Sequence, residues 1–161
     1  MSSVRVFNGP VEVGLRALVL LVEAFPCSFD LQKLVILDHL ILHSGDVDGG
    51  PHSLHPPSPL RSGEVAIRRA LIEDGLALYR ARALISQQPT SEGFAYVAAD
   101  SGAAFLDALR APYVERLRQR AEWAVARFGM LSADKLSRVL EQSLSRWQAE
   151  FTVLSSEGDE V

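Results

Sequence analysis

Residues 78–110 read LYRARALISQQPTSEGFAYVAADSGAAFLDALR, and this stretch decides the fold. Ala83–Gln88 predicts a strand, Pro89–Gly93 a turn and Phe94–Ala98 a second strand, because a cluster of turn-forming residues separates two short runs of strand-forming residues. Alternate apolar residues of the second strand would share one face of a hairpin. A further helix is expected to begin near Ala103, after a capping Asp or Ser.

Three predicted helices precede this hairpin. Their apolar spacing places them at Val11–Phe25, Leu31–His43 and Glu64–Arg82. The first lies between two prolines, which suit a helix start and a helix stop. The β-branched residues in Lys33–Leu37 leave a strand open there, although the length and the lack of strict alternation favour a helix. Gly75 leaves open a division of the third helix into two shorter ones.

The order of three helices followed by a β-hairpin is typical of a winged helix, in which the third helix packs across the first two and the hairpin forms the wing. We therefore expect a mainly α (α+β) fold, with a winged-helix-like core, a small β-hairpin wing and a C-terminal helical hairpin. An unrelated α+β domain with the same order of elements is the alternative.

The C-terminal part predicts two more helices. From Tyr113 to Phe128, apolar residues recur at steps of three and four, which is a heptad-like seam for one partner helix. After Gly129, a final helix is expected from Ser132 to Phe151. The expected organisation is a winged-helix-like domain over 1–110, a helical hairpin over 111–154 and a flexible acidic tail over 155–161.

The segment between the second and third helices is an unusual loop, Ser44–Arg61, with three glycines and four prolines in eighteen residues. Loops this long inside a small domain are uncommon, and they often have a function or are held by a partner. Disorder is the alternative, but two leucines could anchor the loop, and its prolines reduce the entropy lost on ordering.

Composition excludes several classes of protein. The chain has 161 residues, with 16 Lys and Arg against 20 Asp and Glu, a net charge of −4, and 48% hydrophobic residues. These values exclude a disordered chain and argue against a free-standing nucleic-acid binder. The single cysteine excludes an intrachain disulfide framework and a multi-cysteine zinc site. No membrane-spanning run or signal peptide is visible, so we expect a soluble, cytoplasmic protein.

Arginines on the third helix are the candidate DNA contacts. Arg68 and Arg69 lie together, and Arg80 and Arg82 follow at its end, but three acidic residues share the helix. The predicted wing tip, residues 88–92, has no Lys or Arg, and DNA affinity depends heavily on neutralising phosphates. A protein-interaction module is therefore favoured. A winged-helix DNA-binding transcriptional regulator, dimeric through its apolar first helix, remains the alternative.

Four histidines, His39, His43, His52 and His55, fall close together in the sequence. The first two are four residues apart and would project from one face of a helix, with Asp38, Asp46 and Asp48 nearby. Such residues could bind a metal in a hydrolase, a minor alternative, but no HExxH motif is present. His43 and His55 are better explained as groups that anchor the loop. No nucleophile or phosphate-binding motif appears, so we expect no enzyme, no metal and no cofactor.

Three strings carry a family resemblance: FNGPVEVGLRALVLLVEAFP at 7–26, DLQKLVILDHLILHSGDVDGGPHSLHPPSPLRSGE at 30–64, and FLDALRAPYVERLRQRAEWAVARFG at 105–129. They resemble the middle component of bacterial ABC three-component systems, which are anti-phage conflict systems related to the Lamassu type. The most specific part is the HSGD, GGP, SLHP and RSGE series between His43 and Glu64.

The resemblance implies a small non-catalytic subunit encoded beside an SMC/Rad50-like ABC ATPase and an effector, often a nuclease. The middle component would couple the two, and it would meet DNA only within the complex. The family's hallmark is the loop, so the resemblance makes it the candidate partner-binding element. Its candidate residues are His43, Asp46, His55, Arg61 and Glu64.

Overall fold

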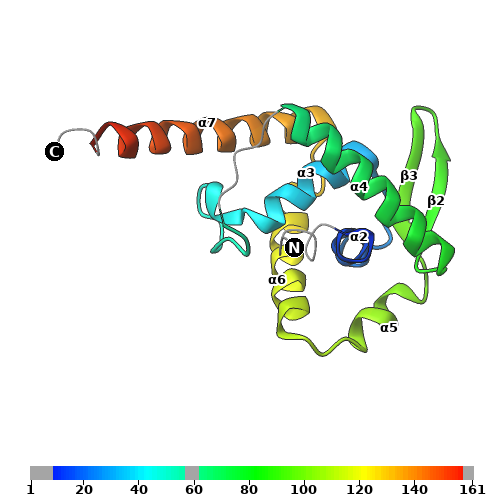
Figure 1. The fold of residues 1–161 in the computed structure, drawn as a ribbon. Helices are drawn as coiled ribbons and strands as arrows, with labels where there is room; N and C mark the ends of the chain where they lie inside the picture. Colours follow the sequence, from blue (N-terminus) through cyan, green and yellow to red (C-terminus); the bar gives the residue numbers. More distant parts are fainter. Residues whose placement is uncertain (1–8, 57–61, 158–161) are drawn as a thin grey trace.

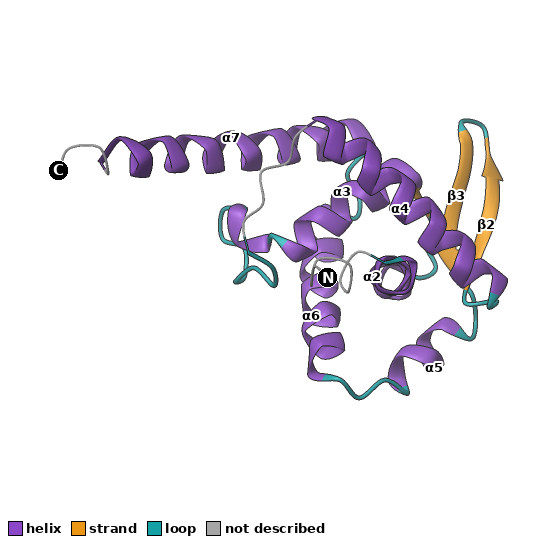
Figure 2. Ribbon diagram, viewed as in Figure 1, coloured by secondary structure: helices purple, strands orange, loops and turns teal. Residues whose placement is uncertain are grey.

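A computed structural model describes residues 9–56 and 62–157, with side chains described at 9–56 and 67–145. The fold is mostly helical (Figures 1 and 2). The helices are α2 (Pro10–Ala24), α3 (Leu31–Leu42), α4 (Ser62–Ala81), α5 (Gly102–Asp107), α6 (Pro112–Phe128) and α7 (Ala133–Glu157), with a 3-10 helix η1 at Ser44–Asp46. The strands are β1 (Phe29–Asp30), β2 (Ile85–Thr90) and β3 (Gly93–Ala98). None of the helices in these ranges has the length and apolar character needed to cross a membrane.

The predicted order of three helices followed by a hairpin is confirmed, and the structure adds a third strand. The two-residue β1, which sequence analysis missed, pairs with β3, so the antiparallel sheet has the order β1-β3-β2. Pro89 was expected in the turn but lies in β2 opposite Phe94. An edge strand tolerates a proline because its outward N–H positions need no partner in the sheet. The turn is therefore confined to residues 91–92 between the strands.

Helix α2 is the centre of the core. Figure 1 shows it nearly end-on, with α4, α5 and α6 around it. Pro10 occupies the first turn of α2. The helix is buried on most sides, because its apolar residues leave only a narrow polar strip. The second predicted helix is also confirmed: the Asp30 side chain accepts a hydrogen bond from the Lys33 backbone N–H at 2.8 Å and caps α3. The strand alternative for residues 33–37 was wrong.

Helices α2 and α4 cross at two glycines. A Cβ atom on Gly75 would lie 2.7 Å from the backbone N of Gly14, and one on Gly14 would lie 2.8 Å from the carbonyl O of Gly75. A Cβ on Gly14 would also collide with the ring of Tyr79. Gly75 therefore does not divide the helix, and α4 runs unbroken from Ser62 to Ala81. Its glycine serves the close approach of two backbones.

The apolar seam of α6 is buried as predicted, but it does not face one partner helix. Its members are Val114, Leu117, Ala121, Ala124 and Phe128. Helix α6 packs mainly on α2 and α3, and α7 packs on α3 and η1. This differs from the expected C-terminal helical hairpin. The apolar residues of α6 belong to the same core as those of α2, because α2 needs cover on several sides.

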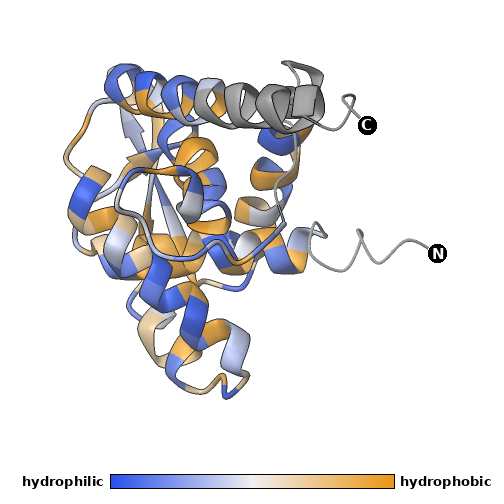
Figure 3. Cartoon of the chain, turned by 90° about the vertical axis from the view of Figure 1, so that its left-hand side faces the viewer, coloured by the Kyte–Doolittle hydropathy of each residue, from blue (hydrophilic) through white to orange (hydrophobic). Residues whose placement is uncertain are grey.

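Helix α7 is longer than expected and extends away from the body (Figure 1). Where Figure 3 colours this helix, hydrophilic and hydrophobic residues alternate, as expected for a helix with one apolar face. Residues 155–157, which were expected in the tail, lie in this helix. The rest of the expected tail, 158–161, lies outside the described residues.

Gly75→Ala tests the helix crossing. Helix propensity alone would stabilise α4 by about 1 kcal/mol. We expect the opposite, a loss of about 1–3 kcal/mol in the free energy of unfolding, because the new methyl group must push α2 away. Urea denaturation followed by circular dichroism measures this. Ala77→Gly, at an exposed site on the same helix, should lose only the propensity difference. A stabilised Gly75→Ala protein would contradict the close crossing.

Candidate functional site

The loop after α3 folds back on the end of that helix. The backbone N–H groups of Leu54 and His55 both donate to the carbonyl O of Leu42, at 3.0 and 3.1 Å. Ser44 Oγ donates to the carbonyl O of His52 at 3.2 Å. A Cβ on Gly50 would collide with the backbone of Ser44, so the tight turn requires a glycine. The described part of the loop, residues 44–56, is therefore held by its own hydrogen bonds.

Helix α6 holds the same loop from the other side. Arg120 Nε donates to the carbonyl O of His52 at 2.9 Å, and Arg127 Nη1 donates to the carbonyl O of Asp48 at 2.7 Å. His55 Nε2 and the hydroxyl of Tyr113 are hydrogen-bonded at 2.7 Å. Both arginines come from α6. No local signal in the sequence indicates that they reach a loop more than 60 residues earlier.

A buried ionic cluster joins α2, α3 and α4. Arg16 Nε and Nη2 donate to Asp38 Oδ1 and Oδ2 at 2.6 and 3.2 Å, and Arg68 Nη1 donates to Oδ2 at 3.0 Å. The side chains of Arg16 and Asp38 are each only 3% exposed, and that of Arg68 is 21% exposed. Because buried charges without partners are costly, the two arginines and the carboxylate depend on one another.

The pKa values of the cluster favour its charged form. Burial alone would raise the pKa of Asp38, but the charge and hydrogen bonds of Arg16 and the charge of Arg68 outweigh it, so that pKa is lowered. Burial alone would lower the pKa of Arg16, but the charge and hydrogen bond of Asp38 raise it overall. The cluster therefore places two positive charges and one negative charge between the helices.

His39 and His43 lie next to this cluster with their ring centroids 4.7 Å apart. Burial lowers the pKa of His39 to about 3, and the charges of His43 and Arg68 contribute to the shift. Burial and the charge of Arg68 lower the pKa of His43 to about 4. Both rings are therefore neutral at pH 7. Within the described residues, neither ring nitrogen of His39 has a hydrogen-bond partner.

The candidate partner-binding residues lie in different surroundings in the structure. His43 is buried at the end of α3, Asp46 lies in η1, and His55 contacts α6 through Tyr113. The anchoring interpretation of His55 is thus supported by geometry. Glu64 lies in the first turns of α4, with its side chain outside the description, and Arg61 lies outside the described residues altogether.

The two candidate DNA contacts both reach neighbouring side chains. Arg68 donates to Asp38, and Arg69 Nη1 donates to Gln32 Oε1 at 3.1 Å. Arg68 therefore has a structural partner on α3, which sequence analysis missed because the two residues are 30 positions apart. This geometry gives no support to the DNA-binding alternative.

The four histidines do not form the ligand set of the metal-hydrolase alternative. His39 and His43 lie inside the core with their rings tilted by 38°, His55 is hydrogen-bonded to Tyr113, and His52 is exposed. Across 9–56 and 62–157, no group of three or more His, Cys, Asp or Glu side chains is placed to hold a metal ion.

Residues 6–150 match the family described as ABC-three component (ABC-3C) system Middle Component 2. The match spans the helices, the hairpin and the loop between α3 and α4, and ends within α7. It confirms the resemblance to a middle component of an ABC three-component system. Comparison with curated proteins and with solved structures gave no match.

Asp38→Asn tests the ionic cluster. The substitution leaves Arg16 buried without a full counter-charge, so we expect a loss of about 3–5 kcal/mol in the free energy of unfolding. Asp107→Asn is the matched control, because its ion pair with Arg118 is exposed and should contribute less than about 1 kcal/mol. Chemical denaturation measures both. Equal, small losses would show that the cluster does not hold the helices together.

The buried histidines predict sensitivity to acid. An unfolded histidine binds a proton near pH 6.5, as estimated for model peptides, whereas folded His39 and His43 do so only near pH 3 and 4. Between these values the unfolded chain binds more protons, so the free energy of unfolding falls as the pH decreases from about 6.5 to 4. Denaturation midpoints across this range report the slope.

His39→Leu should flatten this slope, because one of the histidines with a lowered pKa is then missing, and it should remove a buried ring whose nitrogens have no hydrogen-bond partner among the described residues. His52→Leu is the control, since its side chain is exposed in the loop and should leave the slope unchanged. If His39→Leu kept the full slope, the acid sensitivity would have another origin.

Proposed function

The chain belongs to the Middle Component 2 family of ABC-three component systems, and from this we propose that it is a non-catalytic adaptor in a Lamassu-type defence complex against phage or plasmids. In this role it couples an SMC/Rad50-like ABC ATPase to an effector such as a nuclease. The observation that carries the proposal is the family match over residues 6–150. A middle component of a multi-component system has partner subunits, and an adaptor must bind at least two of them.

A winged-helix core is part of the same proposal. The support for it is the order of elements along the chain, α2-β1-α3-α4-β2-β3. The short β1 pairs with β3, the second strand of the hairpin, which gives the sheet order β1-β3-β2. The predicted wing tip at residues 88–92 has no basic residue, which suits contact with protein more than with phosphate. DNA would then be met only through the assembled complex, in the cytoplasm.

The non-catalytic role is supported by the way the reactive residue types are used. Both carboxylate oxygens of Asp38 accept hydrogen bonds from arginines, and His39 and His43 are buried and neutral. A general acid or base must reach its substrate, so these groups are poorly placed for catalysis. We assign them to holding the three helices in register.

The loop between α3 and α4 is our candidate for one partner surface. The backbone of its described part, residues 44–56, is fixed by α3 and by Arg120 and Arg127 of α6. A loop that is already ordered loses little entropy when a partner binds it, so it can contribute affinity without a large ordering cost. The side chains of Asp48 and His52 are exposed at the surface of this loop.

Co-purification tests the adaptor role. The chain is expressed with an affinity tag together with the ATPase and effector encoded beside it, and the eluate is passed over a size-exclusion column. We expect all three proteins to elute together in fixed proportion. An unrelated ABC ATPase expressed in the same way should not be retained. A chain that elutes alone, while its ATPase is folded and abundant, would refute the adaptor role.

A further inference from the structure

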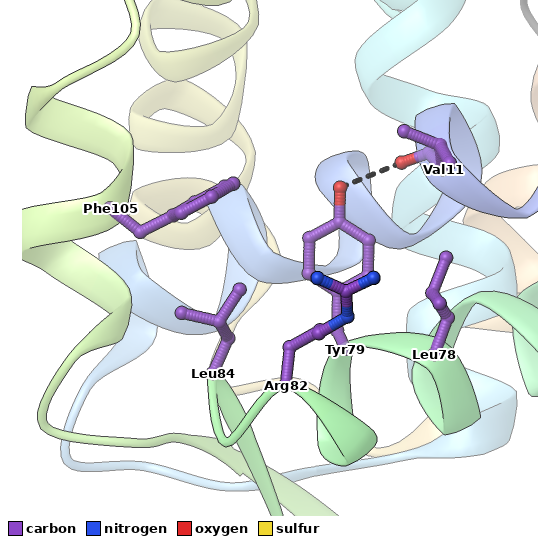
Figure 4. A pocket seen from close by; sticks show the side chains of 6 residues that line it. All are labelled: Val11, Leu78, Tyr79, Arg82, Leu84 and Phe105. Carbon is purple, nitrogen blue, oxygen red and sulfur yellow. Dashed lines mark hydrogen bonds between the residues drawn. The ribbon is translucent and has the colours of Figure 1, made fainter.

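An open apolar pocket of about 460 Å³ lies where the end of α4, the first turn of α2 and α5 meet (Figure 4). It is lined by Val11, Leu78, Tyr79, Arg82, Leu84 and Phe105. Five of these residues are apolar or aromatic, and Arg82 is the charged one. Sequence analysis did not identify this pocket, because its walls come from three segments that are far apart in the chain.

The floor of the pocket is rigid. The Tyr79 hydroxyl donates to the carbonyl O of Val11 at 2.8 Å, and burial, with a smaller contribution from the charge of Glu12, raises the pKa of Tyr79 to about 12. Its ring packs against Gly14 on one side and meets Phe105 edge to face, with centroids 6.3 Å apart. The ring is therefore fixed before any ligand arrives.

The turn that places Leu84 in the wall is strained. Ala83 has a φ of 59°, in the left-handed region that is costly for residues other than glycine. The Leu84 backbone N–H donates to the carbonyl O of Tyr79 at 3.0 Å and closes this turn. With the hydrogen bond from the Ala83 N–H to the carbonyl O of Arg80 at 3.0 Å, this turn is a Schellman cap at the end of α4, and it holds Leu84 in the wall of the pocket.

The rim exposes apolar side chains to water. Val11 is 58% exposed and Phe105 is 37% exposed, although both border a preformed apolar floor. Beside them, Figure 4 shows the guanidinium group of Arg82 in front of the Tyr79 ring. Among the contacts of the described residues, the Arg82 side chain has no hydrogen bond or ion pair. The pocket thus combines an apolar hole with one available positive charge.

We propose that this pocket is a docking site for a partner subunit, which inserts an aromatic or long aliphatic side chain and places a neighbouring Asp or Glu against Arg82. Charge complementarity selects the occupant, because an apolar anchor alone leaves Arg82 without a counter-charge at the rim. A preformed pocket that receives an apolar anchor is the usual form of a binding hot spot. The inference rests on the proposed adaptor function and locates one of its contacts.

Site-specific crosslinking in the assembled complex tests the location. Phe105→p-benzoylphenylalanine places a photoreactive ring at the rim, and Phe94→p-benzoylphenylalanine, on the exposed hairpin at 57% exposure, is the matched control. We expect position 105 to crosslink to one segment of a partner subunit that has an apolar residue beside an Asp or Glu. Position 94 should not crosslink to that segment.

Charge reversal tests the chemistry. Arg82→Glu should weaken binding of the partner subunit at least about tenfold, as measured by biolayer interferometry with the purified proteins. Arg80→Glu is the control: it makes the same charge change at an exposed site two residues earlier, in the last turn of α4 and outside the pocket, and should change affinity less than about twofold. Replacing the crosslinked acidic residue of the partner with Lys should restore binding to the Arg82→Glu chain. Thermal melts confirm that both variants are folded.

The outcomes separate the two proposals. If the complex forms but Arg82→Glu binds normally, or position 105 crosslinks to no partner segment of this kind, the docking site is wrong and the adaptor function stands. Crosslinks between two copies of this chain would make the pocket a self-association surface and overturn the assigned occupant. If the unsubstituted chain forms no complex, both the adaptor function and the docking site fail.

Discussion

The shape of this molecule depends on a single carboxylate, Asp38, and the two arginines that surround it. The three side chains come from α2, α3 and α4, and they meet in a core that is mainly apolar. The hydrophobic effect has no preferred direction, whereas the charge-assisted hydrogen bonds at 2.6 and 3.0 Å require a particular geometry, so they add a directional constraint on how the three helices meet. We infer that the cluster contributes specificity of packing more than net stability, because burying charge has its own cost.

Arginine side chains in this molecule bind backbone carbonyl groups as well as carboxylates. Arg120 and Arg127 donate to carbonyl oxygens of the loop that follows α3. A segment rich in glycine and proline would ordinarily lack the side chains to hold itself in place. Here α6 supplies the missing donors, so the most unusual stretch of the sequence becomes a shaped surface. This conversion fits a subunit that must offer a defined face to its partners.

The close crossing of α2 and α4 has a second consequence, where the first turn of α2 lies beside the last turns of α4. Because Gly14 carries no side chain, the ring of Tyr79 can pack directly on the α2 backbone and reach the carbonyl oxygen of Val11. That contact fixes the floor of the apolar pocket beneath Phe105 and Arg82. One steric requirement thus connects core packing to the surface that we propose for docking.

The sequence by itself determined the order of the elements, the approximate limits of the helices and the buried seam of α6, because periodicity and punctuating Pro, Gly and capping residues act locally. It missed β1, whose two residues are too short to form a pattern. Only the tertiary structure decided the partners: Arg68 pairs with Asp38 across 30 positions, Arg120 reaches a loop 68 positions away, and the seam of α6 faces α2 and α3. Local spacing shows which face of an element is apolar or charged, but the group that meets this face depends on how the chain folds back on itself.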